Sequence, residues 1–336
     1  MRAKGKPFAL FGCGTVYFRL YYAPMKNTLL IISLLLLIAP ASAAKYAGEP
    51  FSLGVGAGPL AMGGAVVAGP YDATSGYFNP AGLSFISGRQ IQAMHAETFG
   101  SLLNHDYIGY ASNNGKTSGL NSYGFYLYYL GGGGVKLTAY DSVANWPYVV
   151  REDNHFDLMF GASLAGRWRE KFAYGLTAKV IYRDITAETA YGLGLDAGLI
   201  YQVDDFITAA LTVTDITYTF LAYSNDNTES IYPALKPGLS YRYQRTDVEI
   251  IASLQTVLRF EGRRWAAELW EGDISADFQG GIQIAFKKVA FGRAGYDQGH
   301  FTAGLGAAVG RYLFDVAYLH HEDLDETFRF SAGINF

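Results

Sequence analysis

Residues 172–183 read FAYGLTAKVIYR, and two kinds of side chain alternate along them. Apolar and aromatic residues occupy every second position from Phe172 to Tyr182, and smaller or polar ones, including Lys179 and Arg183, lie between them. Successive side chains of a β-strand point to opposite faces of the sheet, so the pattern predicts a strand with one apolar face. The stretches 191–202 and 276–287 repeat it.

The composition of the two faces indicates which environment such strands occupy. Composition alone leaves a soluble β-sandwich or propeller open. Many polar-face positions, however, are Gly, Ala, Ser or Thr, and the apolar face begins and often ends in Tyr or Phe. Segments of about 10 residues with aromatic ends match tilted transmembrane strands, whereas soluble strands run nearer 5 or 6. We therefore predict an all-β fold, an antiparallel transmembrane β-barrel of the bacterial outer membrane. Its lumen-facing polar residues would be Lys179, Arg183, Asp196 and Gln202.

The number of alternating segments gives an estimate of the strand number. Fifteen segments occur, at 90–98, 105–112, 121–130, 134–140, 155–168, 171–183, 190–202, 206–214, 236–244, 247–257, 276–287, 289–297, 301–309, 311–320 and 327–336. Bacterial barrels normally have even numbers of strands, so we expect about 14, with 134–140 as the weakest segment. The glycines Gly131–Gly134 and Gly280–Gly281 are candidate kink sites.

Two longer connections, 215–235 and 258–275, break the alternation. The second contains Trp265, Leu269 and Trp270, and it is either a short amphipathic piece at the membrane interface or an ordinary loop with two anchoring tryptophans.

The N-terminal region predicts export. Lys26, the apolar run 29–39 and Ala41-Ser42-Ala43 form the three parts of a signal peptide, which we assign to residues 25–43. Because Met25 directly precedes Lys26, we expect translation to begin there, and we interpret residues 1–24 as a misannotated upstream extension. A signal anchor is the alternative.

The charge and cysteine content exclude several functions. Residues 1–43 contain five basic residues, no acidic residue and the sole cysteine, Cys13, so the remainder has 21 basic and 30 acidic residues. An acidic chain has no general affinity for nucleic acid. Without cysteine there is no lipoprotein anchor and no thiolate chemistry.

No catalytic motif is recognisable, and we expect neither an enzyme, a cofactor nor a metal. The only His–carboxylate cluster, His320-His321-Glu322-Asp323, is interpreted as a solvated turn. An active site assembled from dispersed Ser, His and acidic residues is the alternative.

The last strand carries a pattern of its own. Phe328, Phe330, Ile334 and the terminal Phe336 lie on one face of segment 327–336. This resembles the terminal β-signal that the outer-membrane barrel assembly machinery reads, although Ser331 stands where Gly is usual.

Residues 51–83, FSLGVGAGPLAMGGAVVAGPYDATSGYFNPAGL, do not alternate. Their many glycines weaken helix and strand alike. Irregular, apolar backbone at membrane depth is tolerated only inside protein or in a water-lined cavity. We therefore predict that residues 44–88 form a hatch inside the lumen, and that residues 89–336 form the barrel.

This segment resembles the N-terminal signature of the long-chain fatty acid transporter (FadL-like) superfamily, most closely its shorter PorV/PorQ-like branch. The matching residues include Gly58, Pro59, Gly63, Gly64, Asp72, Asn79, Pro80, Ala81 and Gly82. The stretches 211–215 and 237–241 look like the mid-barrel segment of that branch. The resemblance implies a 14-stranded barrel with an N-terminal hatch.

The resemblance also carries functional expectations. Its PorV/PorQ-like branch implies a protein that binds or shuttles exported proteins at the outer membrane, as in type IX secretion. The alternative is a FadL-like channel for uptake of fatty acids or other hydrophobic small molecules. The partners expected are outer-membrane lipids, the barrel assembly machinery, and either secreted cargo proteins or a hydrophobic small molecule.

Overall fold

The computed structural model describes residues 46–98, 102–186, 188–320 and 326–336. The predicted upstream extension and signal peptide lie outside these residues, as do His321, Glu322 and Asp323.

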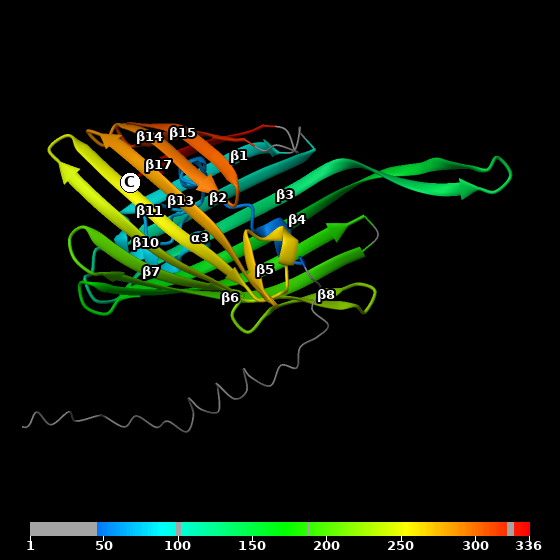
Figure 1. Cartoon of the computed structure of the whole chain (residues 1–336), viewed down its shortest axis with the longest axis horizontal. Coiled ribbons are helices and arrows are strands. Elements are labelled where there is room, and N and C mark those ends of the chain that lie inside the picture. The colour runs from blue at the N-terminus through cyan, green and yellow to red at the C-terminus, as the bar shows by residue number, and fades with distance from the viewer. Residues whose placement is uncertain (1–45, 99–101, 187, 321–325) are drawn as a thin grey trace, which may run out of the picture. The chain divides into compact units, whose positions relative to one another are not determined.

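In the part of the chain that the structure describes, fourteen antiparallel strands form a closed barrel (Figure 1), as the sequence predicts. They are β1 (Arg89–Thr98), β2 (Leu103–Asn113), β3 (Gly119–Asp141), β4 (Trp146–Arg167), β5 (Phe172–Ile185), β6 (Glu188–Gln202), β7 (Ile207–Thr214), β10 (Ala234–Arg245), β11 (Val248–Arg259), β13 (Ile274–Phe286), β14 (Ala290–Asp297), β15 (His300–Val309), β16 (Tyr312–Leu319) and β17 (Thr327–Asn335).

Each strand pairs with the next around the ring, and β1 pairs with β17 to close it, from Gln90 opposite Asn335 to Glu97 opposite Phe328. The two stretches 211–215 and 237–241 come together where β7 pairs with β10, with Leu211 opposite Pro237. Pairing is continuous through Gly280 and Gly281, so no β-bulge interrupts β13 at this predicted kink site.

Segments 121–130 and 134–140 are one strand, β3, so counting them separately was wrong. The run Gly131–Gly134 interrupts the alternation without ending the strand, because it contains a β-bulge between Gly132 and Val135. Gly134 takes a positive φ of 77°, which glycine adopts freely. Likewise β4 begins at Trp146, well before the predicted residue 155.

Beyond this bulge, residues 135–153 form a two-stranded ribbon, the β3–β4 ribbon, that projects past the rest of the barrel (Figure 1). Its tip is a tight turn in which Asp141 accepts hydrogen bonds from the backbone N–H groups of Val143 and Ala144. These two bonds, the one from Ala144 foremost, hold the pKa of Asp141 below its ordinary value.

The other long connections lie at the same end of the strands as the ribbon. The connection after β7 contains the hairpin β8 (Thr219–Tyr223) and β9 (Thr228–Ile231), and β8 pairs with β6. The connection after β11 contains the 3-10 turn η3 (Arg264–Ala266) and β12 (Leu269–Glu271). Trp265 and Trp270 are in contact there, with ring centroids 4.7 Å apart.

The outer wall of the barrel is apolar. Outward side chains such as Leu193, Leu254 and Leu305 are between 67% and 69% exposed, which is typical of surfaces that face lipid rather than water. Among the described residues, no helix has both the length and the apolar character needed to span a membrane.

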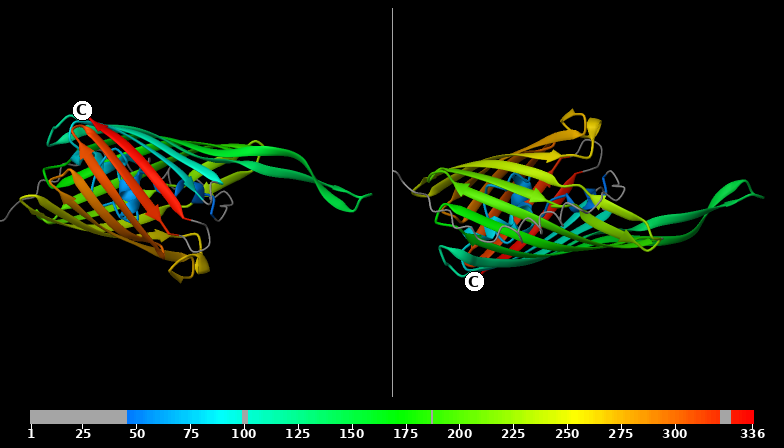
Figure 2. Two further views of the ribbon diagram at one scale, coloured as in Figure 1. Left: turned by 90° about the horizontal axis from the view of Figure 1, so that it is seen from above. Right: turned by 90° about the horizontal axis from the view of Figure 1, so that it is seen from below.

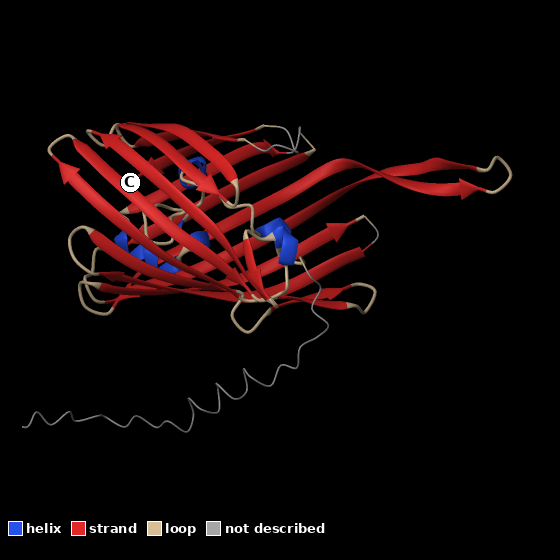
Figure 3. Cartoon of the chain, in the orientation of Figure 1, coloured by secondary structure: helices blue, strands red, loops and turns tan. Residues whose placement is uncertain are grey.

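Residues 46–88, the lumen segment, run through the interior of the ring (Figures 2 and 3). They contain η1 (Glu49–Phe51), α2 (Ala57–Ala61), α3 (Ser75–Phe78) and η2 (Pro80–Phe85). The segment starts near the long connections, where the Tyr46 hydroxyl donates to the carbonyl of Arg263, and ends at Gly88, whose carbonyl accepts from the N–H of Asn113.

We predict that the end bearing the ribbon faces the outside of the cell, because outer-membrane barrels have short periplasmic turns and longer extracellular loops. Val143 at the ribbon tip is 94% exposed. A single cysteine in Val143→Cys should react with a membrane-impermeant maleimide on intact cells. Asp205→Cys, in the short β6–β7 turn, should react only after the outer membrane is permeabilised; the reverse pattern would contradict this orientation.

Candidate functional site in the barrel lumen

The lumen segment lies directly on glycines of the inner wall. A Cβ atom on Gly175 of β5 would collide with the backbone of Pro80 and Ala81, and one on Gly281 of β13 with the backbone of Met62. Gly304 of β15 similarly leaves room for Ala61. The glycines on the polar face of the predicted strands thus allow one backbone to approach another closely.

The first half of the predicted hatch motif is bound through its backbone. The N–H of Ala57 donates to Ser331 Oγ of β17 at 2.8 Å, and that of Gly63 to Thr302 Oγ1 of β15 at 3.0 Å. Gly63 and Gly64 have φ of 63° and 71°, which explains why glycines stand there. Gly58, next to Pro59, faces the Arg293 guanidinium of β14.

The second half of the motif is a capped turn. Asn79 caps η2, because its side-chain oxygen accepts from the N–H of Ala81 at 3.1 Å and its side-chain nitrogen donates to the carbonyl of Val67 at 2.9 Å. Asp72 accepts from the N–H of Thr74 at 2.8 Å. Gly82 packs on Tyr71. Residues 72–82 therefore form a self-bonded unit that docks on the wall.

An aromatic cluster lines the lumen on the β1–β4 side. Tyr77 of α3 is at its centre; its hydroxyl donates to the carbonyl of Phe51 at 2.6 Å, and its ring stacks with that of Tyr128 at 6.3 Å. The other members are buried apolar side chains of the segment and the wall, among them Phe78, Met94, Tyr107, Tyr126 and Met159. Sequence reasoning missed this cluster, because its wall residues lie within apolar runs that show no clear alternation.

Buried ion pairs lie beside this cluster, on β4, β5 and β6. Lys179 Nζ lies 2.9 Å from Asp196 Oδ1 and 2.7 Å from Asp215 Oδ1, and all three side chains are almost fully buried. Arg183 Nε lies 2.6 Å from Asp157 Oδ1. The side chains of three of the four predicted lumen residues, Lys179, Arg183 and Asp196, therefore lie on the lumen side of the barrel wall.

The remaining residue, Gln202, is half-buried at the end of β6, on the same face as Asp196. The partner Asp215 could not be assigned from the sequence, because it follows the last residue of β7, where the alternation stops.

The lumen contains little free space. Three small cavities have volumes of about 60, 50 and 30 Å³, and Lys236 lines all of them. A dry cavity that accommodates benzene measures roughly 150 Å³. None of these three cavities is therefore large enough for a hydrocarbon, and displacement of the lumen segment would enlarge them.

Within the described residues, no group of three or more His, Cys, Asp or Glu side chains could hold a metal ion. His320 is exposed, and the other members of its predicted cluster lie outside the described residues. The described side chains of the lumen are engaged in apolar packing and in ion pairs.

The C-terminal strand closes the ring. Phe328, Phe330 and Phe336 are 50% to 62% exposed on the outer wall, and Ile334 is half-buried on the same face. Recognition of these residues by the assembly machinery stays a prediction.

The fold is similar to that of solved outer-membrane channels. CymD, a monoaromatic hydrocarbon channel, matches with a TM-score of 0.60 and 12% identity over 84% of this chain and 98% of its own. The toluene transporters TbuX of Ralstonia pickettii and TodX of Pseudomonas putida each match with a TM-score of 0.54 and 14% identity over 84% of this chain, and over 98% and 97% of their own. No family model matches the sequence, and no curated protein is significantly similar to it.

The chain is therefore a multi-pass β-barrel of the bacterial outer membrane, with the fold of these channels. At such low identities the likeness concerns the fold alone. This is the fold that the FadL-like resemblance implies, a barrel of 14 strands, whereas the PorV/PorQ-like branch finds no support in the likeness.

Gly281→Ala should destabilise the protein by about 2 kcal/mol, because its methyl group would collide with the Met62 backbone and overpack the lumen. Gly292→Ala on the neighbouring strand is the matched control, since its added methyl group meets no atom within 4 Å. Urea unfolding measures both variants; equal stability would disprove the close docking of the segment.

Lys179→Met should cost about 3 kcal/mol of unfolding free energy, because it leaves Asp196 and Asp215 buried side by side without their cation. Arg151→Met, which breaks the exposed pair with Asp153 on the ribbon, should change stability little. Denaturant titration compares them, and a loss at Lys179 no greater than at Arg151 would show that the buried cluster contributes nothing.

Proposed function

We propose that this protein is an outer-membrane channel for the uptake of hydrophobic small molecules, and that residues 46–88 are its hatch. The observation that carries the proposal is the correspondence of the whole barrel to channels whose cargo is toluene or other monoaromatic hydrocarbons. Those chains are matched over 97% or 98% of their extent.

One part of the lumen suits an apolar cargo, although buried ion pairs of Lys179 and Arg183 lie beside it. The aromatic cluster offers rings and thioethers in one place, and apolar small molecules bind in cavities lined predominantly by such side chains. When the lumen segment is in place, Tyr77, Phe78 and Phe51 cover this surface. Displacement of α3 would expose it.

The hatch must move for transport, and its contacts allow this. Several of its bonds to the wall are single backbone-to-side-chain bonds, such as those of Ala57 and Gly63, which water can replace. Residues 72–82 bond mostly within themselves, so they can move as a unit. The wall glycines on which the segment rests, such as Gly175 and Gly281, have no side chains that would hold it in place.

The test locks the hatch to the wall. The Cβ position of Gly76 in α3 lies 3.8 Å from Ser163 Cβ of β4, which suits a disulfide, whose Cβ atoms are typically about 3.8 Å apart. In a host that lacks its own channels for hydrophobic compounds, the Gly76→Cys/Ser163→Cys variant should take up radiolabelled toluene only when reduced. Oleate, run in parallel, distinguishes fatty acids from hydrocarbons.

The single variants Gly76→Cys and Ser163→Cys serve as controls and should transport equally under both redox conditions. Uptake of neither compound above the empty-vector level by the native protein would refute the proposal. Uptake that persists in the oxidised double variant would refute the hatch.

One feature favours a second function, docking of exported proteins. Both edges of the β3–β4 ribbon are unpaired in the described structure, because β3 pairs with β2 only up to Gly131 and β4 with β5 only from His155. Trp146 and Tyr148 are 71% and 53% exposed on it. Such an edge can accept a further strand. Recovery of secreted proteins crosslinked at the ribbon would support this function.

A further inference from the structure

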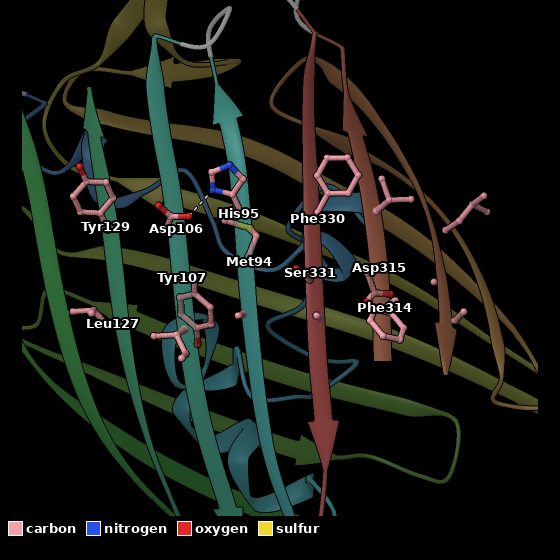
Figure 4. A pocket seen from close by; sticks show the side chains of 17 residues that line it. Met94, His95, Asp106, Tyr107, Leu127, Tyr129, Phe314, Asp315, Phe330 and Ser331 are labelled. Atoms are coloured by element: carbon pink, nitrogen blue, oxygen red, sulfur yellow. Dashed lines mark hydrogen bonds and ion pairs between the residues drawn. The ribbon is translucent and has the colours of Figure 1, made fainter. Parts of the chain in front are cut away.

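An open groove of about 820 Å³ crosses the outer wall where β17 meets β1 (Figure 4). Its floor consists of small side chains, Ala93 of β1 and Ala332 of β17, which lie opposite each other in the strand pairing. Larger apolar residues flank them in register, Ile108 of β2 beside Ala93 and Phe314 of β16 beside Ala332. The groove is thus a hollow between larger apolar side chains of the outer wall.

An exposed polar pair stands at one end of this hollow. His95 Nδ1 lies 2.7 Å from Asp106 Oδ1, and the two side chains are 56% and 45% exposed (Figure 4). Both side chains point outward. His95 is two residues beyond Ala93 on β1, and Asp106 of β2 is paired with His95. Ionisable groups on a lipid-facing surface are costly and mark functional sites by default.

The pair lies toward the end of the strands that carries the β3–β4 ribbon. His95 is three residues from Thr98, the end of β1 on that side. At about 3.3 Å per residue, the pair is roughly 10 Å from this end, measured along the strand. Aromatic rings flank it in register, Tyr129 opposite Asp106 and Phe330 opposite His95.

The charges around the groove select the sign of the headgroup. Its lining contains no Lys or Arg, and the second carboxylate there, Asp315, points into the lumen and is paired with Arg293 at 2.6 Å. A phosphate-rich headgroup would find no fixed cation. An ammonium group, in contrast, would find the outward carboxylate of Asp106 and, in register beside it on β3, the aromatic ring of Tyr129, and both groups attract cations.

We propose that this groove binds a membrane amphiphile with an ammonium-bearing headgroup. Its hydrocarbon tail lies over Ala93 and Ala332, and its ammonium group contacts Asp106 beside Tyr129. His95 is a positioning residue, because its imidazole holds the carboxylate in the outward orientation. The site is separate from the lumen and does not depend on the proposed transport function.

Native mass spectrometry of the full-length protein in a neutral detergent tests the site, with phosphatidylethanolamine, phosphatidylcholine, phosphatidylglycerol and lipid A as probes. We expect the barrel to retain one molecule of either ammonium lipid, at about fivefold higher occupancy than phosphatidylglycerol or lipid A. Asp106→Asn should abolish this preference while acyl-chain binding persists. His95→Gln should reduce the preference, and in the double variant it should add nothing to the effect of Asp106→Asn.

The groove itself is tested by filling it. Ala93→Leu and Ala332→Leu, on two different strands, should each abolish retention of phosphatidylethanolamine. Ala178→Leu, at an exposed outward position of β5, is the matched control and should retain it. Heat-modifiable migration on a gel reports whether each variant folds. If one of Ala93→Leu and Ala332→Leu does not fold, the other alone tests the groove.

Three results would overturn the proposal. Equal retention of all four lipids by the native protein would show an unselective surface, and preferential retention of lipid A would assign the groove to phosphate-rich headgroups. Retention by Ala93→Leu or Ala332→Leu equal to that of Ala178→Leu would place the bound lipid elsewhere.

Discussion

The contact of the lumen segment with inward-facing glycines is the constraint on which the rest of this structure depends. A barrel of fourteen strands encloses a space that its own side chains do not fill. Here a length of irregular backbone fills it, and it fits because Gly175, Gly281 and Gly304 offer no Cβ atoms to hold it off the wall. Side chains at those positions would require a thinner segment or a wider barrel.

Polar groups of the wall satisfy the irregular backbone. Regular strands bond to their neighbours, but residues 46–88 have few such partners, so Ser331, Thr302 and Gln255 of the wall accept from their N–H groups instead. Each of these lies on the inward face. Alternate side chains of the barrel strands therefore have two roles: the outward ones face lipid, and the inward ones bond to the backbone of the lumen segment.

The sequence predicted the fold well, because alternation depends only on local periodicity. The closing strand and the inward orientation of Lys179 and Asp196 follow from period-2 patterning over regular strands. The patterning gave fifteen segments, and the number fourteen followed only with the even strand number of bacterial barrels. Prediction was wrong at Gly131–Gly134, where a bulge disturbs the period although the strand continues. Periodicity is a reliable guide only where successive residues alternate strictly between the two faces.

The candidate site was less predictable, because it is made of contacts between distant residues. Nothing local to Asp215 indicates that it meets Lys179, and nothing local to Tyr77 indicates that it stacks on Tyr128. The motif 79–83 was recognisable, yet its role as a capped turn resting on Gly175 required the β5 strand to be in place. The sequence therefore identified residues of the site but not the distant residues that they contact.

The seam between β1 and β17 has a consequence for the order of assembly. It joins Gln90 to Asn335, residues at opposite ends of the barrel sequence, so it is the pairing with the largest loop to close. The cavities left in the finished lumen are too small for a chain to thread through. We therefore expect this seam to pair late in assembly, around a lumen segment that already lies against the nascent sheet.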